Sequence, residues 1–173
     1  MRLSFNCILF FFIIVSRSYG QHYDSSRSLM QQANKMGDAF MRGDYKTFTH
    51  YTYPKIVELM GGADKMAEDL SKTTINTTAK GIILINIRFG EVSKIFKSGN
   101  ELQCTLPQYS KIKLPNGSAE ATSTLIAISA DNGNHWTFVD TSNKDMSTIR
   151  KLLPHLSKEI VIPPMQTPVR YNN

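Results

Sequence analysis

The densest group of side chains with acid–base chemistry lies around His50, which has three tyrosines near it in the chain: Tyr45, Tyr51 and Tyr53. A histidine acting as general base, next to a tyrosine that donates a hydrogen bond, suits proton abstraction beside a carbonyl group. We therefore treat His50 as a candidate catalytic residue and the tyrosines as candidate ligand contacts. The alternative is that Tyr45 and Tyr53 pack under the first helix while His50 faces solvent.

The second candidate base is Asp140, which follows Trp136 and Phe138 with the spacing of a β-strand. Alternate residues of a strand share one face, so the Asp140 carboxylate can point into the interior beside the two rings. A carboxylate in such a place is a candidate general base, and Trp136 is a candidate ligand contact, either as core or as a lid. The alternative is that Asp140 caps the turn at residues 141–145.

Other chemical signatures are absent from the sequence. The histidines at 22, 135 and 155 are too far apart to indicate a metal site, and no H-x-x-x-H, C-x-x-C, G-x-S-x-G or phosphate-binding loop occurs. We expect neither a metal nor a cofactor. Cys104 lies in the alternating run Leu102-x-Cys104-x-Leu106, which indicates a buried small hydrophobic residue and not a nucleophile.

The first residues have the pattern of a secretory signal peptide. Arg2 precedes the apolar run Ile8–Val15, and Ser18-Tyr19-Gly20 supplies the small residues that a signal peptidase reads, so we expect cleavage after Gly20. The apolar run of roughly eight residues is shorter than the ~20 that a spanning helix needs. These features predict an exported protein, periplasmic or secreted, with no stable membrane insertion after cleavage.

The mature chain has the size of one domain and a mild charge. Removing 20 of the 173 residues leaves 153, and the loss of Arg2 and Arg17 leaves 18 basic against 14 acidic residues. The basic residues are scattered and are not interleaved with aromatic ones, which is typical of a solvated surface. We therefore expect no nucleic-acid partner.

Helical spacing dominates the first third of this chain. A helix that starts near Ser25 and ends at Gly43 has four apolar residues on one face: Leu29, Ala33, Met36 and Phe40. Three shorter helices are expected after it, at residues 44–52, 55–60 and 64–73. The threonine-rich run at 73–78 is poor in helix formers and is expected to lead out of the last one.

Strand spacing takes over from Ile82. Four residues at alternate positions are expected to face the same way: Ile83, Ile85, Ile87 and Phe89. A bulge is expected at Gly90, and Pro107 is expected to make its part of the second strand an edge or a bulge. Turn residues, including Asn132-Gly133, divide the region into an antiparallel meander of about four strands, followed by a short helix and a proline-bearing tail. This order predicts an α+β fold with helices gathered on one face of a curved sheet.

At this level the chain resembles the nuclear transport factor 2-like (cystatin-like) superfamily over residues 27–165. The resemblance rests on Arg42-Gly43-Asp44-Tyr45, the Tyr51-Thr52-Tyr53-Pro54 step and Gly61-Gly62 before another helix. Within the superfamily the chain looks like exported members from Bacteroidetes-type bacteria, which carry a D-x-G-x-x-W-x-F-x-D strand pair. Here that pair is supplied by five residues: Asp131, Gly133, Trp136, Phe138 and Asp140.

The chain is therefore expected to consist of a signal peptide at 1–20, one domain at 21–165 and a tail at 166–173. The resemblance implies that the helices of this domain wrap a strongly curved sheet into a cone, with an apolar pocket between helices and sheet. Relatives include ketosteroid isomerases, dehydratases, polyketide cyclases and modules without activity, and no acid–base dyad of the enzymes can be matched here residue by residue. The favoured hypothesis is an exported module that binds a small apolar ligand or a protein partner in its pocket. The alternatives are a lyase or isomerase that uses His50 or Asp140 as base, and a module that forms homodimers through its sheet face.

Overall fold

The computed structural model describes residues 17–171. Most of the predicted signal peptide, including its apolar run, lies outside the described residues, and so does Cys7. The predicted cleavage site after Gly20 falls within the first helix, α1, which spans Arg17–Met41. Within the described part of the chain, no helix is long and apolar enough to cross a membrane.

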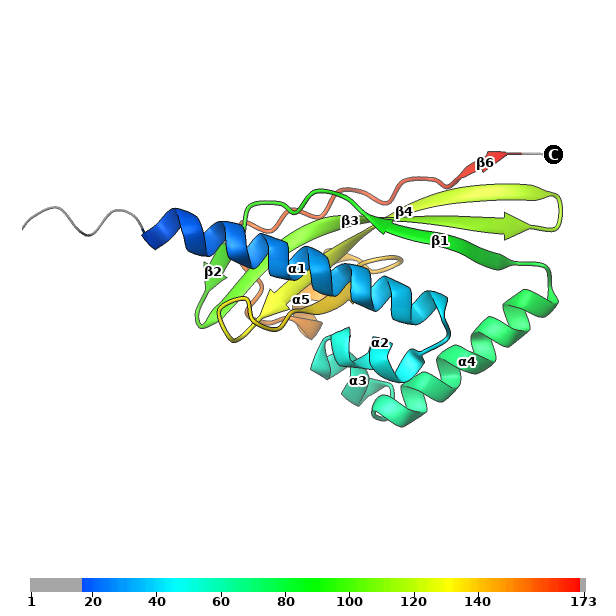
Figure 1. Ribbon diagram of the computed structural model, residues 1–173, viewed down its shortest axis with the longest axis horizontal. Coiled ribbons are helices and arrows are strands. Elements are labelled where there is room, and N and C mark those ends of the chain that lie inside the picture. The colour runs from blue at the N-terminus through cyan, green and yellow to red at the C-terminus, as the bar shows by residue number, and fades with distance from the viewer. Residues whose placement is uncertain (1–16, 172–173) are drawn as a thin grey trace, which may run out of the picture.

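The described residues form five helices and a six-stranded antiparallel sheet, which confirms the predicted α+β class. The sheet is not closed: its order is β1-β3-β4-β5, with β2 also pairing with β3 and β6 with β4 (Figure 1). After α1 the elements are α2 Tyr45–Tyr51, α3 Pro54–Leu59, α4 Ala63–Ala79, β1 Ile83–Phe89, β2 Phe96–Ser98, β3 Glu101–Leu114, β4 Gly117–Ser129, β5 Thr137–Asp140, α5 Met146–Leu152 and β6 Val169–Tyr171.

Capping residues set some of the helix boundaries, but two predicted boundaries are wrong. The expected start of α1 near Ser25 is wrong, because the helix already begins at Arg17. Gly43 has φ +73° after α1, and the Asp44 side chain accepts a hydrogen bond from the Thr47 backbone N–H at the start of α2. The expected end of α4 near residue 73 is wrong, because the helix continues to Ala79. Its threonines are accommodated: Thr77 donates to the Thr73 carbonyl, and Thr74 receives a hydrogen bond from the Tyr45 hydroxyl at 2.7 Å.

The expected alternation along β1 is also wrong in its first half. The register between β1 and β3 shifts between Leu84 and Asn86, so the bulge lies here and not at Gly90. The shift turns Ile85 to solvent, with 47% of its surface exposed, and places Leu84 on the same side as Ile87. The side chains of β1 that face the interior are therefore three positions apart at this point.

Pro107 lies in a central strand without a bulge, because β3 pairs with β4 in one continuous register from Leu102 to Leu114. The proline is tolerated because its missing N–H faces the gap between β1 and β2. In that gap the Pro107 carbonyl accepts a hydrogen bond from Gly90 N–H at 2.9 Å. The predicted edge character therefore holds on this side of β3 alone.

The two faces of the sheet bury separate cores. On the inner face, α1 packs Leu29, Ala33 and Met36 against a set of residues that includes Cys104 and Leu106 of β3 and Trp136, which directly precedes β5. On the outer face, Ile126, Ile128 and Val139 pack against α5 and the segment up to Ile160. The expectation that the helices share one face is therefore wrong for α5. The tail also forms β6, a strand that the proline-rich sequence did not indicate.

Hydrogen bonds attach α1 to the β4–β5 hairpin. Gln32 accepts from the Trp136 backbone N–H at 2.9 Å and donates to the Asn134 carbonyl at 2.9 Å, and Ser28 donates to the Gly133 carbonyl at 2.8 Å. Gly133 has φ +91°, and a Cβ there would come within 2.7 Å of the Ser25 hydroxyl oxygen. The hairpin predicted from Asn132-Gly133 is confirmed, and glycine is needed there for both conformation and space.

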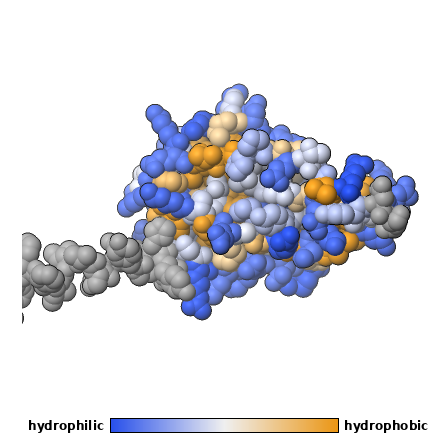
Figure 2. All heavy atoms as spheres, turned by 90° about the horizontal axis from the view of Figure 1, so that it is seen from above, coloured by the Kyte–Doolittle hydropathy of each residue, from blue (hydrophilic) through white to orange (hydrophobic). Residues whose placement is uncertain are grey.

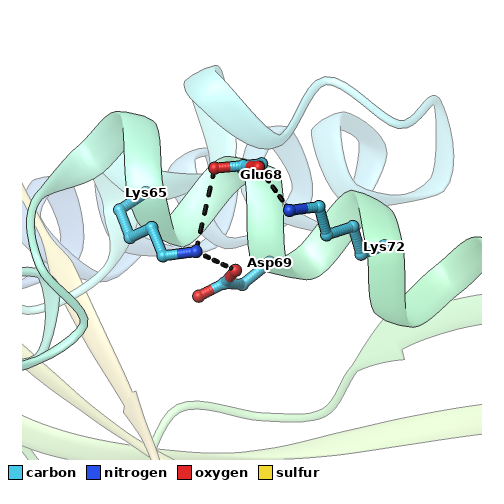
Figure 3. Close-up of polar contacts among 4 residues, drawn as sticks. All are labelled: Lys65, Glu68, Asp69 and Lys72. Carbon is cyan, nitrogen blue, oxygen red and sulfur yellow. Dashed lines mark hydrogen bonds and ion pairs between the residues drawn. The ribbon is translucent and has the colours of Figure 1, made fainter.

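The face of the molecule drawn in Figure 2 is mixed in polarity. Figure 2 shows apolar side chains in separate groups among polar and charged ones. On α4, Lys65 forms ion pairs with Asp69 at 2.6 Å and Glu68 at 3.7 Å, and Lys72 pairs with Glu68 (Figure 3). These pairs follow helical spacing and are exposed to solvent, so they lie on the outer surface of the helix and position no interior group.

Candidate functional site

The inner face of the sheet is only partly filled by α1, and a cavity of about 560 Å³ remains between the helices and the β1–β3–β4–β5 surface. The helices contribute apolar side chains to its wall: Met36, Phe40, Phe48, Ile56, Met60 and Met66. The strands and α5 add Leu84, Ile87, Leu125, Phe138 and Leu152. A concave site of this size with mostly apolar walls is typical of a small-molecule binding pocket.

The cavity opens to solvent at α3. Leu59 and Met60 line it and are 62% and 41% exposed, and no residue of α3 itself is buried. An apolar lip around an apolar cavity gives an apolar molecule a continuous path from the surface to the interior.

Five polar residues interrupt the apolar wall: Thr52, Gln108, Ser110, Asp140 and Lys144. Gln108 and Ser110 continue the inner-face series of β3 beyond Cys104 and Leu106. The wall thus changes from apolar to polar along one face of one strand. A few polar groups in an otherwise apolar pocket are what orients a ligand.

Asp140 combines the two roles that its position suggested. It lines the cavity next to Phe138, and it also caps the following turn. Its Oδ1 atom accepts hydrogen bonds from the Ser142 backbone N–H at 2.8 Å and the Ser142 hydroxyl at 2.7 Å. No hydrogen bond from the described part of the chain reaches the other oxygen, Oδ2.

Lys144 is half-buried at the same part of the wall. Its ammonium group donates to two backbone carbonyls, that of Asp140 at 2.9 Å and that of Ser142 at 3.4 Å. Two acceptors leave one of the three ammonium hydrogens for another partner. Lysine is rarely withdrawn from water without such partners, so the carbonyls hold it where it lies.

The other residues predicted from sequence lie elsewhere. His50 is exposed on α2 and does not line the cavity. Tyr45 is buried under α1, where its ring contacts Phe40 edge-on at 5.4 Å. The ring centroid of Tyr51 lies 6.1 Å from that of His135. Tyr53 packs against the outer-face core, where burial raises the pKa of its hydroxyl and the negative charge of Glu101 raises it further.

Trp136 is fully buried and is part of the packed core. Its indole N–H donates to the Gly133 carbonyl at 3.1 Å, so the ring is held within the hairpin and does not reach the cavity wall. Of the six candidate residues, the structure thus brings Asp140 to the cavity and places His50, the three tyrosines and Trp136 outside its lining.

Cys104 is fully buried, as predicted, and burial raises the pKa of its thiol to about 12. A thiol that stays protonated at all ordinary pH values is no nucleophile. Among the described residues, no group of three or more His, Cys, Asp or Glu side chains is placed to hold a metal ion.

Sequence reasoning missed Gln108, Ser110 and Lys144 as cavity residues. For the first two a signal exists, because the inner-face positions of β3 change from apolar to polar after Pro107. Lys144 lies in a turn, where spacing gives no orientation.

No family model, curated protein or solved structure matches the chain.

Proposed function

We propose that the protein is an exported module of the nuclear transport factor 2-like type that binds a small apolar molecule in the inner-face cavity. The observation that carries the proposal is the cavity itself: about 560 Å³, walled by apolar side chains and open at α3. Water in such a space has few hydrogen-bond partners, so its replacement by an apolar molecule is favourable.

The order of the elements supports the family assignment. Four helices precede the strands, α1 lies on the inner face, and the resemblance of residues 27–165 expected a pocket between helices and sheet. The signal-peptide pattern supports export.

A binding measurement with a neutral apolar fluorophore, N-phenyl-1-naphthylamine, tests this function. We expect its fluorescence to rise on binding to the protein. In Leu84→Trp the larger ring enters the cavity, so binding weakens about tenfold, which equals about 1.4 kcal/mol. Ile85→Trp is the matched control. The Ile85 side chain is next to Leu84 in the sequence but points to solvent, so binding to this variant stays unchanged.

Equal affinities in the two variants would contradict the proposal. The unfolding midpoint of each variant shows whether it folds. If Leu84→Trp does not fold, Ile87→Trp replaces it, since Ile87 lines the same wall.

A second function, a lyase or isomerase, is favoured by the position of Asp140 in the cavity wall beside apolar side chains. In that case Asp140 is the general base, and His50, which is exposed, has no part in the reaction. Turnover of a carbonyl substrate that disappears in Asp140→Asn but persists in His50→Ala would support catalysis. Turnover that survives in Asp140→Asn would exclude this base.

A further inference from the structure

Two opposite charges line the cavity without pairing with each other. Asp140 and Lys144 both contribute to its wall, yet within the described residues no contact of 4.0 Å or less joins the carboxylate to the ammonium group. Instead, Lys144 reaches backbone carbonyls and Asp140 holds Ser142. Each charged group is fixed in place by its own neighbours.

The remaining hydrogen-bonding capacity is complementary. Asp140 retains an oxygen, Oδ2, that can accept a hydrogen bond, and Lys144 retains an N–H that can donate one. A group that donates to the first and accepts from the second satisfies both at once. A hydroxyl group does this, because its single oxygen carries one donor and two acceptor positions.

The geometry points to an aliphatic alcohol as the ligand class: an apolar body in the cavity and one neutral hydroxyl between Asp140 and Lys144. This inference rests on the proposed function and names the chemistry of the ligand at the same site. The apolar wall receives the body, and the pair of charges receives the head.

Ionic heads are disfavoured for an electrostatic reason. A carboxylate is attracted by Lys144 but repelled by Asp140, and an ammonium group experiences the reverse, so neither gains enough to replace its lost hydration. A hydroxyl costs less to withdraw from water and meets no like charge. The site therefore discriminates among molecules with the same apolar chain by their head group.

Competition among three ten-carbon probes tests this directly. We measure how three probes displace N-phenyl-1-naphthylamine from the protein: 1-decanol below its solubility limit, and decanoate and decylammonium below their micelle concentrations. We expect 1-decanol to bind about tenfold more tightly than either ion, because an ionic head is left imperfectly paired.

Two variants shift this preference in opposite directions. In Asp140→Asn the Oδ1 acceptor for Ser142 is kept while the negative charge is removed, so decanoate gains affinity relative to decylammonium. In Lys144→Met the positive charge is removed, so decylammonium gains. The matched controls, Asp38→Asn and Lys151→Met, change exposed residues outside the cavity wall and leave the preference of the wild-type protein unchanged.

The inference is overturned if the fluorophore binds but all three probes displace it equally, or if either ion binds as tightly as the alcohol. It is also overturned if Asp140→Asn and Lys144→Met leave the ratio of the two ions unchanged. Failure of the fluorophore and all three probes to bind would instead contradict the proposed function itself, so the two failures are distinguishable.

Discussion

The inner face of the sheet has two halves that share the same strands but differ in how they are filled. In the filled half, Leu29 and Ala33 of α1 lie against Cys104, Ala127 and Trp136, all of them fully buried. In the hollow half, the wall residues Leu84, Ile87, Gln108 and Ser110 surround a cavity of about 560 Å³.

The difference teaches where stability and function reside. The filled half has the close packing of a protein interior, and its buried polar groups, such as the Trp136 indole N–H, have partners. The hollow half leaves apolar surface and hydrogen-bonding capacity unused. Changes in the filled half should therefore affect folding, and changes in the hollow half should affect binding.

Thiol reactivity gives the largest expected contrast between the halves. Cys104 stays protonated between pH 7 and 9, because its pKa is raised to about 12, so it should not react with Ellman's reagent in the folded protein. In Cys104→Ala/Ser110→Cys the new thiol faces the open cavity. It should react roughly a thousandfold faster at pH 8, near the ordinary thiol pKa of about 8.5. Equal rates for the two thiols would break the comparison.

Truncating one side chain in each half gives the next contrast. Trp136→Ala removes a fully buried ring and should lower the free energy of unfolding by about 3–5 kcal/mol. Leu84→Ala removes a half-buried side chain that already borders empty space, so it should cost about 1 kcal/mol. Urea unfolding measures both values, and similar losses would show that the hollow half is packed after all.

Enlarging side chains reverses the test. Cys104→Leu adds atoms where no space exists and should cost about 1–3 kcal/mol. Ser110→Leu places the same side chain on the same strand face within the hollow half, where it should change the stability by less than about 0.5 kcal/mol. If Ser110→Leu costs as much as Cys104→Leu by thermal unfolding, the cavity does not exist in solution.

The smallest effect is expected at the ion pairs of α4, which serve as a reference outside both halves. Lys72 lowers the pKa of Glu68, so any contribution of this pair is present near neutral pH and lost in acid. Both groups are in water, where the attraction is screened. Lys72→Ala should therefore leave the urea midpoint at pH 7 unchanged, with or without added salt, and a clear loss would contradict this.

Much of the fold was predictable because local signals and tertiary structure agree. Asn132 and Gly133 both adopt positive φ, as their hairpin required, and Gly43 with Asp44 separates α1 from α2. The predictions failed where tertiary contacts override local preference. The Tyr45 hydroxyl donates a hydrogen bond to Thr74 in the part of α4 that continues beyond the predicted end. The tail pairs with β4 although the sequence of the tail is rich in proline.

The candidate site was predictable only in part. Strand alternation correctly set Asp140 on the face of Trp136 and Phe138, and it lines the cavity. Strand alternation could not show that α1 leaves the hollow half of the inner face uncovered, because that depends on how the helix lies across the sheet. The tyrosines around His50 were grouped because they are close in the sequence. In the structure their side chains lie apart: Tyr45 contacts Phe40 of α1, and Tyr53 packs against the outer-face core.

The central claim is that the hollow half binds an apolar molecule, and methionine methyl NMR tests it most directly. Met36, Met60 and Met66 line the cavity, whereas Met41 and Met146 are exposed outside its wall. On titration with 1-decanol we predict that the methyl signals of the first three shift together while those of the other two stay in place. Unchanged signals for the cavity methionines, or equal shifts for all five, would contradict the claim.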